Sequence, residues 1–416
     1  MTDIGKKVQD WTISKKEDLI SFFANVYPDE GINNNGTLKY NDGGTSCYAW
    51  EYRGDNGKNY FIKILKDSSQ YTEIEEQRIP QVKKIVREYA NNGGNASIPD
   101  ESISITAEKL QGNLPQELKD LFLNKLIAKD NLILNKDFKF LEPVNTRRII
   151  RSDKLANASQ RAFAAPKNHL LEHDISEKYL QTSIAPKDIE KEFETLGKFH
   201  SYFLEKDEAK AVGHLFSDPI FSYNEVKDMV KSNKININPA QQRSFNKIIN
   251  KINSLQPTWE KIDKFPKTLT HNDAHPLNFL QDENGKISLI DFDDASYKTA
   301  IYDLSLPLVY GNLKDEQIEA MFKGYIKGGG DLKKEQVEEI YNVYLLQKLS
   351  QFALKIKEND VEFLNNKDNL DNIVLVIDEI EKKQQNNTPL KIFKKIEQEK
   401  VLNKLFIKPK IEGRIR

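Results

Sequence analysis

The chain has 416 residues, more than one ordinary hydrophobic core accommodates, so its length predicts two lobes or domains. Apolar residues make up 38% and charged residues 30%, which is typical of a globular protein with a well-charged surface. The net charge of −1 excludes a global field that would attract nucleic acid, and no apolar run reaches the roughly 18 residues of a membrane span. Cys47 is the only cysteine, which excludes an internal disulfide framework, and the N-terminus lacks an apolar signal segment; both predict a cytoplasmic protein.

The N-terminal part predicts a helix followed by an antiparallel sheet. A capping box over 14–17 begins the helix, and Pro28 is expected to end it. Three strands are expected next, over 37–40, 47–52 and 59–65. The turn between the first two strands contains Gly43, Gly44 and Ser46. Glycine in such a turn allows backbone N–H groups to approach a phosphate, although an ordinary hairpin would use the same residues.

The third strand carries Lys63 inside the apolar run from Tyr60 to Leu65. A buried lysine is unfavourable unless it is paired, so this position indicates a functional charge. The alternative is an edge strand that presents Lys63 outward. A helix is then predicted over 72–92. We expect a first segment capped by Thr72 to end near Glu76, before Pro80, since proline kinks or restarts a helix.

Residues 93–167 give the weakest signals, and we interpret 95–167 as an insertion. Its basic run is typical of a solvated loop, with contact to an anionic ligand as the alternative. The segment 169–174 predicts the last strand of a small lobe.

The remaining chain is mostly helical. Helices are predicted over 187–204, from Pro239, and over 314–327, 333–357 and 370–384, with Trp259 in a short connection. The apolar stripe of 333–357 is interpreted as core. His200 lies on or beside an apolar face and is interpreted as a packed core residue. The last segment, 385–416, is basic and amphipathic, and it fits a docking helix, a partner contact or a frayed tail.

The segment 269–303 concentrates the polar groups that phosphoryl transfer requires. Asp273 and Asn278 lie in one loop, and Asp291 follows a hairpin whose turn contains Asn284-Gly285. A carboxylate can orient and deprotonate a hydroxyl, while an amide and a second carboxylate can hold magnesium. The strands 279–281 and 287–290 would bring both ends of the hairpin together. Simple turn chemistry and a metal cluster of His271, Asp273 and His275 are the alternatives.

The chain resembles the aminoglycoside phosphotransferase and choline kinase family, a branch of the protein-kinase-like fold. The resemblance rests on three motifs: His271-x-Asp273-x4-Asn278, Ile290-Asp291-Phe292-Asp293-Asp294-Ala295 and Tyr302-Asp303-Leu304. It implies that Asp273 is the catalytic base and that Asn278 and Asp291 bind magnesium, with Asp293 assisting. It also implies that His271 braces the loop and that Asp303 ties the loop to the large lobe.

The same resemblance implies how ATP is bound. The phosphate-binding lysine would be Lys63 and its glutamate partner Glu76, with Glu73 and Glu75 as further candidates. The alternative is that all three glutamates are solvated charges on the helix surface. The turn with Gly43, Gly44 and Ser46 would cover the phosphates, and the backbone near Glu172 and Asp174 would face the adenine.

The implied fold is a two-lobed α+β, protein-kinase-like fold with an antiparallel small lobe over 1–175, a helical catalytic lobe over 176–384 and the tail 385–416. The implied activity is transfer of the γ-phosphoryl group of ATP, with Mg²⁺, to a hydroxyl of a small molecule. The alternatives are a protein Ser/Thr kinase, which would use the insertion or the basic tail to contact protein, and a nucleotide-binding scaffold without catalysis.

Overall fold

The computed structural model describes residues 12–26, 28–41, 47–55, 59–65, 73–97, 101–106, 130–136, 142–143, 185–213, 221–232, 237–274, 278–281, 285–292, 294–310 and 313–406. The chain divides into two compact units. The first comprises Met1–Ala90 and Ser97–Leu141, and the second comprises Asn91–Ala96 and Glu142–Arg416. The predicted boundary at 175 and most of the predicted insertion lie outside the described residues.

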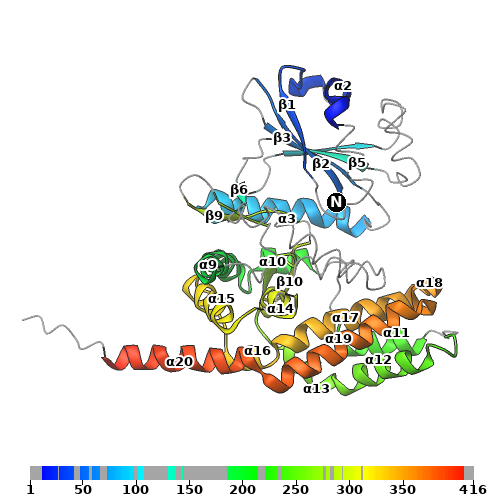
Figure 1. Ribbon diagram of the computed structural model, residues 1–416, viewed down its shortest axis with the longest axis vertical. Coiled ribbons are helices and arrows are strands. Elements are labelled where there is room, and N and C mark those ends of the chain that lie inside the picture. The colour runs from blue at the N-terminus through cyan, green and yellow to red at the C-terminus, as the bar shows by residue number, and fades with distance from the viewer. Residues whose placement is uncertain are drawn as a thin grey trace, which may run out of the picture. The chain divides into compact units, whose positions relative to one another are not determined.

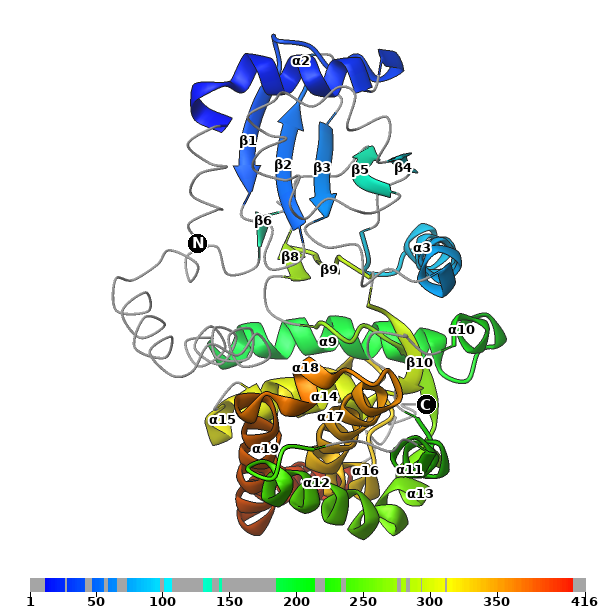
Figure 2. The ribbon, with the colours of Figure 1, turned by 90° about the vertical axis from the view of Figure 1, so that its right-hand side faces the viewer.

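The first unit contains a five-stranded antiparallel sheet in the order β1-β2-β3-β5-β4 (Figure 2). Its strands are β1 (Thr37–Asn41), β2 (Cys47–Arg53), β3 (Asn59–Leu65), β4 (Glu101–Thr106) and β5 (Asp130–Lys136). The three strands predicted from the sequence are therefore confirmed. Because β3 pairs with both β2 and β5, Lys63 lies on a central strand, and the alternative of an edge strand is wrong.

Helix α2 (Lys16–Val26) packs on this sheet through aromatic residues (Figure 1). The Phe23 and Trp50 rings meet edge to face with centroids 5.7 Å apart, and both side chains are fully buried. The Trp50 indole Nε1–H donates to Thr12 Oγ1 at 3.0 Å, which satisfies its buried polar atom. Helix α2 ends at Val26, before Pro28, as predicted, and a short 3₁₀ turn, Pro28–Glu30, follows.

Helix α3 (Glu73–Asn91) is continuous through Pro80, so the predicted break before Pro80 is wrong. Proline removes one backbone hydrogen bond, but the later turns bury an apolar stripe that stabilises the helix. That stripe consists of Val82, Ile85, Val86 and Tyr89.

The second unit is built mainly from helices: α9 (Pro186–Phe203), α10 (Asp207–Val212), α11 (Tyr223–Ser232), α12 (Gln242–Ser254), α13 (Gln256–Asp263), α14 (Ile301–Tyr310), α15 (Asp315–Lys327), α16 (Lys334–Glu338), α17 (Ile340–Lys357), α18 (Val361–Asn365), α19 (Lys367–Asn386) and α20 (Thr388–Phe406). Two small antiparallel sheets accompany them. One pairs β7 (Lys267–Thr270) with β10 (Ser296–Thr299), and the other contains β6 (Glu142–Pro143), β8 (Phe279–Gln281) and β9 (Ile287–Leu289). The described chain is thus an α+β structure.

Glycines allow α9 and α15 to pack closely along each other, and the two helices lie side by side in both ribbon views (Figures 1 and 2). A Cβ atom on Gly197 would overlap the Tyr325 carbonyl oxygen, and one on Gly324 would overlap the Glu190 carbonyl oxygen. This close backbone contact requires glycine. It sets the distance between two helices that both contribute to the site described below.

Two further expectations about helices need correction. Trp259, expected in a connection, lies in α13, where its ring is buried and its Nε1–H donates to the Phe221 carbonyl at 2.7 Å. The helix predicted over 333–357 is divided at Glu339 into α16 and α17. The apolar stripe of α17 forms core as predicted, with Tyr344, Leu349 and Phe352 at most 1% exposed.

Candidate active site

Strand pairing brings the two predicted site loops together. Strand β7 ends at Thr270 and pairs with β10, which begins at Ser296 directly opposite it. The loop that follows β7 and the loop that precedes β10 therefore leave the same end of this two-stranded sheet. Strand β10 was not predicted, because its four residues do not alternate between apolar and polar in the way that indicates a strand.

Asp273 and Asn278 are in direct contact. The Asn278 amide Nδ2 donates to Asp273 Oδ2 at 3.1 Å and to the Asp273 carbonyl oxygen at 2.8 Å. Asn278 is buried, whereas Asp273 is partly exposed. The amide therefore fixes the orientation of a carboxylate that still reaches solvent.

The hairpin β8–β9 connects Asn278 to Asp291. The Ile290 N–H donates to the Asn278 carbonyl oxygen at 3.0 Å, so the residue before Asp291 is bonded to Asn278. Gly285 has a φ of 80°, as the predicted Asn-Gly turn requires. Asp291 is exposed and has a φ of 63°, a conformation that non-glycine residues rarely adopt.

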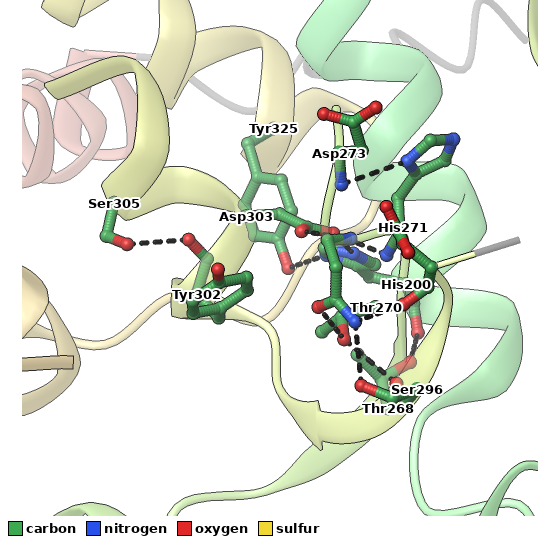
Figure 3. A network of polar contacts seen from close by, with 12 residues as sticks. His200, Thr268, Thr270, His271, Asp273, Ser296, Tyr302, Asp303, Ser305 and Tyr325 are labelled. Carbon is green, nitrogen blue, oxygen red and sulfur yellow. Dashed lines mark hydrogen bonds and ion pairs between the residues drawn. The ribbon is translucent and has the colours of Figure 1, made fainter. Parts of the chain in front are cut away.

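Asp303 holds the backbone of the loop that carries Asp273 (Figure 3). Its Oδ2 accepts from the His271 N–H and its Oδ1 accepts from the Asn272 N–H, each at 2.7 Å. The side chain is fully buried. Burial alone would raise the pKa of Asp303, but the hydrogen bond from His200 and the electrostatic effect of His200, followed by the electrostatic effect and N–H group of His271, hold that pKa below its ordinary value.

His271 lies behind the loop. Its Nε2 pairs with the Ile290 carbonyl oxygen at 2.7 Å, and its Nδ1 accepts from the Asp273 N–H at 3.3 Å. Its ring centroid is 4.9 Å from that of Phe292, which in turn is 5.3 Å from Phe199 of α9. These contacts connect the loop before Asp291 with the loop that carries Asp273.

The sequence patterns did not identify Asn272 as a site residue, although it lies between two predicted site residues. Its φ is 68°, and its amide group donates to Ser296 Oγ at 2.7 Å and to the Asp294 carbonyl oxygen. The Thr270 hydroxyl is within 2.8 Å of both Asn272 Oδ1 and the Ser296 carbonyl oxygen. Asparagine tolerates a left-handed conformation better than most residues, and this was the available signal.

Other predicted site residues are described partly or not at all. For Lys63 and Glu76 the structure describes only the backbone, on β3 and α3 of the first unit. Outside the described residues lie Gly43, Gly44, Ser46, Glu172, Asp174, His275 and Asp293.

The residues present fit a hard divalent cation. Because Asn278 Nδ2 donates to Asp273, the amide oxygen is the atom that can face a cation, and Asp291 adds an exposed carboxylate nearby. Magnesium prefers such oxygen ligands and retains several waters. Within the described ranges, no three His, Cys, Asp or Glu side chains are placed to hold a metal together. Likewise, none of the described helices is long and apolar enough to cross a membrane.

Comparison with known proteins identifies the family that these motifs resemble. Residues 170–336 match the sequence model of the phosphotransferase enzyme family. The predicted resemblance is confirmed. The match includes the loop and hairpin from Thr270 to Asp303, but not Lys63 or Glu76. No curated protein matches the chain significantly.

Several solved structures are similar to the chain. An aminoglycoside 2′-phosphotransferase-IIIa in complex with GDP has 14% sequence identity and a TM-score of 0.50, with 88% of this chain and 96% of that chain covered. A choline/ethanolamine kinase family protein from Mesorhizobium loti has 13% identity and a TM-score of 0.49, covering 91% and 98%. A macrolide 2′-phosphotransferase from Brachybacterium faecium has 13% identity and a TM-score of 0.46, covering 83% and 98%. The similarity to the first of these is one of fold.

Proposed function

We propose that this protein transfers the γ-phosphoryl group of ATP, with magnesium, to a hydroxyl group of a small molecule. The observation that carries the proposal is the contact between Asp273 and Asn278 on a loop that one hairpin connects to Asp291. The family match over 170–336 supports a phosphotransferase.

Asp273 acts as the base in this proposal. Its carboxylate, held by the Asn278 amide, orients the acceptor hydroxyl and takes its proton as the oxygen attacks the γ-phosphorus. The bond from the γ-phosphorus to the bridging oxygen breaks, ADP leaves, and the proton passes from Asp273 to solvent. Positioning therefore accounts for most of the contribution of this loop.

Asn278 and Asp291, with Asp293, would hold the magnesium ion. When bound, magnesium would neutralise phosphate charge that the carboxylates themselves repel. From the family resemblance we also propose that Lys63 binds the phosphates and pairs with Glu76. Gly43, Gly44, Ser46, Glu172 and Asp174 would contact the nucleotide. The GDP in the aminoglycoside 2′-phosphotransferase complex makes GTP the competing donor to test.

The experiment compares Asp273→Ala with Asp291→Ala, and uses Asp228→Ala, an exposed carboxylate on α11, as the control. Without the base, turnover should fall by ~10²–10⁴, about 3–5 kcal/mol, while nucleotide affinity changes little. Asp291→Ala should weaken both nucleotide binding and turnover. Hydrolysis of ATP measures turnover before the acceptor is known, and hydroxylated metabolites and generic protein substrates then serve as acceptors. Equal turnover of Asp273→Ala and wild type would exclude Asp273 as the base.

Removal of metal gives a second test. Calorimetry should show ATP binding at least ~10-fold weaker in EDTA than in magnesium, about 1.4 kcal/mol. In Asp291→Ala this difference should shrink, because one of the proposed ligands is gone. The same affinity with and without magnesium in wild type would refute the metal assignment.

A further inference from the structure

His200 is a buried polar residue on the aromatic face of α9. Its side chain is 2% exposed, and its ring centroid lies 6.0 Å from that of Phe199 and 5.6 Å from that of Tyr325. Burial of an imidazole is costly unless both ring nitrogens are paired. Here both are paired, because Nε2 lies 3.0 Å from Asp303 Oδ2 and Nδ1 lies 3.0 Å from the Tyr325 hydroxyl (Figure 3).

We propose that His200 is a positioning residue for the catalytic loop, acting through Asp303 and oriented by Tyr325. The proposal rests on the proposed function, in which Asp273 is the base. His200 precedes Asp273 by 73 positions in the chain and comes from a different element, so loop geometry depends on how α9, α14 and α15 pack.

The two carboxylate oxygens of Asp303 accept hydrogen bonds from three donors. Oδ1 accepts from the Asn272 N–H, while Oδ2 accepts from both the His271 N–H and His200 Nε2. An ionised carboxylate only accepts hydrogen bonds, so Nε2 of His200 must carry a proton. This third donor opposes rotation of the carboxylate away from the two backbone groups.

Tyr325 selects the orientation of the imidazole. Burial first, and then the negative charges of Asp303 and Asp331, raise the pKa of the Tyr325 hydroxyl, which therefore stays protonated. A protonated hydroxyl can donate to Nδ1 and so favours the tautomer with its proton on Nε2. Gly197, one turn before His200, allows the Tyr325 backbone to approach α9 closely enough for this contact.

The loop requires such support because its backbone is strained. Asn272, whose N–H group Asp303 accepts, has a φ of 68°, and Asp273 follows immediately. Conformations of this kind persist only where surrounding contacts impose them. Loss of the His200 contact should therefore displace Asp273, although the Asp273 side chain itself is unchanged.

The experiment uses four variants. His200→Leu removes the donor to Asp303, His200→Gln retains an N–H donor at similar reach, and Tyr325→Phe removes only the hydroxyl. Phe203→Leu is the matched control, because it disturbs the buried face of α9 one turn later without removing a polar group. Two quantities are measured: kcat and KM for nucleotide, and hydrogen exchange of peptides covering 268–274.

We expect kcat of His200→Leu to fall ~10–100-fold, with KM for nucleotide within about 2-fold, since small displacements of a catalytic group have effects of this size. His200→Gln should recover most of kcat, and Tyr325→Phe should lose less than His200→Leu. Amides of 271 and 272 should exchange faster in His200→Leu and Tyr325→Phe but not in Phe203→Leu.

The two measurements separate this proposal from the proposed function. If wild type turns over no nucleotide but the amides of 271 and 272 lose protection as expected, the proposed function fails and the positioning contact stands. The positioning proposal is overturned if exchange in Tyr325→Phe matches wild type while His200→Leu and Phe203→Leu lose protection equally. It is also overturned if His200→Leu keeps wild-type kcat.

Discussion

Two polar networks in the second unit use similar groups for different purposes. The buried network consists of Asp303, His200, Tyr325 and the backbone of 271 and 272. The surface network joins α15 to α20 through Glu319, Lys323, Lys395 and Glu399. Its shortest contact, 2.6 Å between Lys323 Nζ and Glu319 Oε1, is no longer than any contact around Asp303.

Burial, and not contact distance, distinguishes the two networks. Asp303 is fully buried, whereas the Lys395 side chain is 59% exposed. Hydrogen bonds from Lys323 and then Lys395 lower the pKa of Glu319, but solvent and salt screen these charges. An unpaired group inside the protein has no water to replace a lost partner. The buried network therefore fixes geometry, and the surface network contributes little to stability.

The largest effect should come from Asp303→Ala. Removal of this carboxylate leaves the His271 and Asn272 N–H groups and the His200 imidazole without their acceptor. We expect the free energy of unfolding to fall by about 3–5 kcal/mol, as for other broken buried pairs. Urea denaturation of the variant and of wild type measures it. A loss below about 1 kcal/mol would mean that the buried network contributes no more to the free energy of unfolding than the surface network does.

The pH dependence of the unfolding free energy should also distinguish the buried network from the surface network. The pKa of Asp303 in the folded state lies below its ordinary value of 3.8. The ionised side chain therefore makes its full contribution to the unfolding free energy at pH values above 3.8. The contribution is lost as the pH falls through the lower, folded-state pKa, when the buried carboxylate gains a proton. The gap in unfolding free energy between wild type and Asp303→Asn should thus stay constant at neutral pH and narrow in acid. A gap that widens in acid would contradict the assigned direction.

The smallest effect should come from Lys395→Ala in the surface network. We expect a loss of at most about 1 kcal/mol, and a smaller one in high salt. Phe393→Ala on the same helix is the control, because Phe393 is 1% exposed and packs on Phe322 with ring centroids 5.8 Å apart. That variant should lose about 3–5 kcal/mol. A comparable loss in Lys395→Ala would show that ion pairs, and not apolar contacts, hold α20 on α15.

Much of the fold followed from local patterns in the sequence. The strands β1, β2 and β3 were predicted to within one residue, because alternation and turn residues act over short distances. The hairpin before Asp291 was predicted from Asn284-Gly285 for the same reason. Expectations failed where packing outweighed a local rule, as in the continuous helix through Pro80.

The sequence by itself determined which residues carry the candidate chemistry: Asp273, Asn278 and Asp291 lie close enough along the chain for one loop and one hairpin to bring them together. Only the tertiary structure decided what holds them. His200 looked like a packed core residue, and it is buried, but its partners Asp303 and Tyr325 lie 103 and 125 residues away. No local pattern encodes such contacts, because they depend on where three helices cross. A polar side chain on an apolar face shows that a partner is needed, and the fold supplies it.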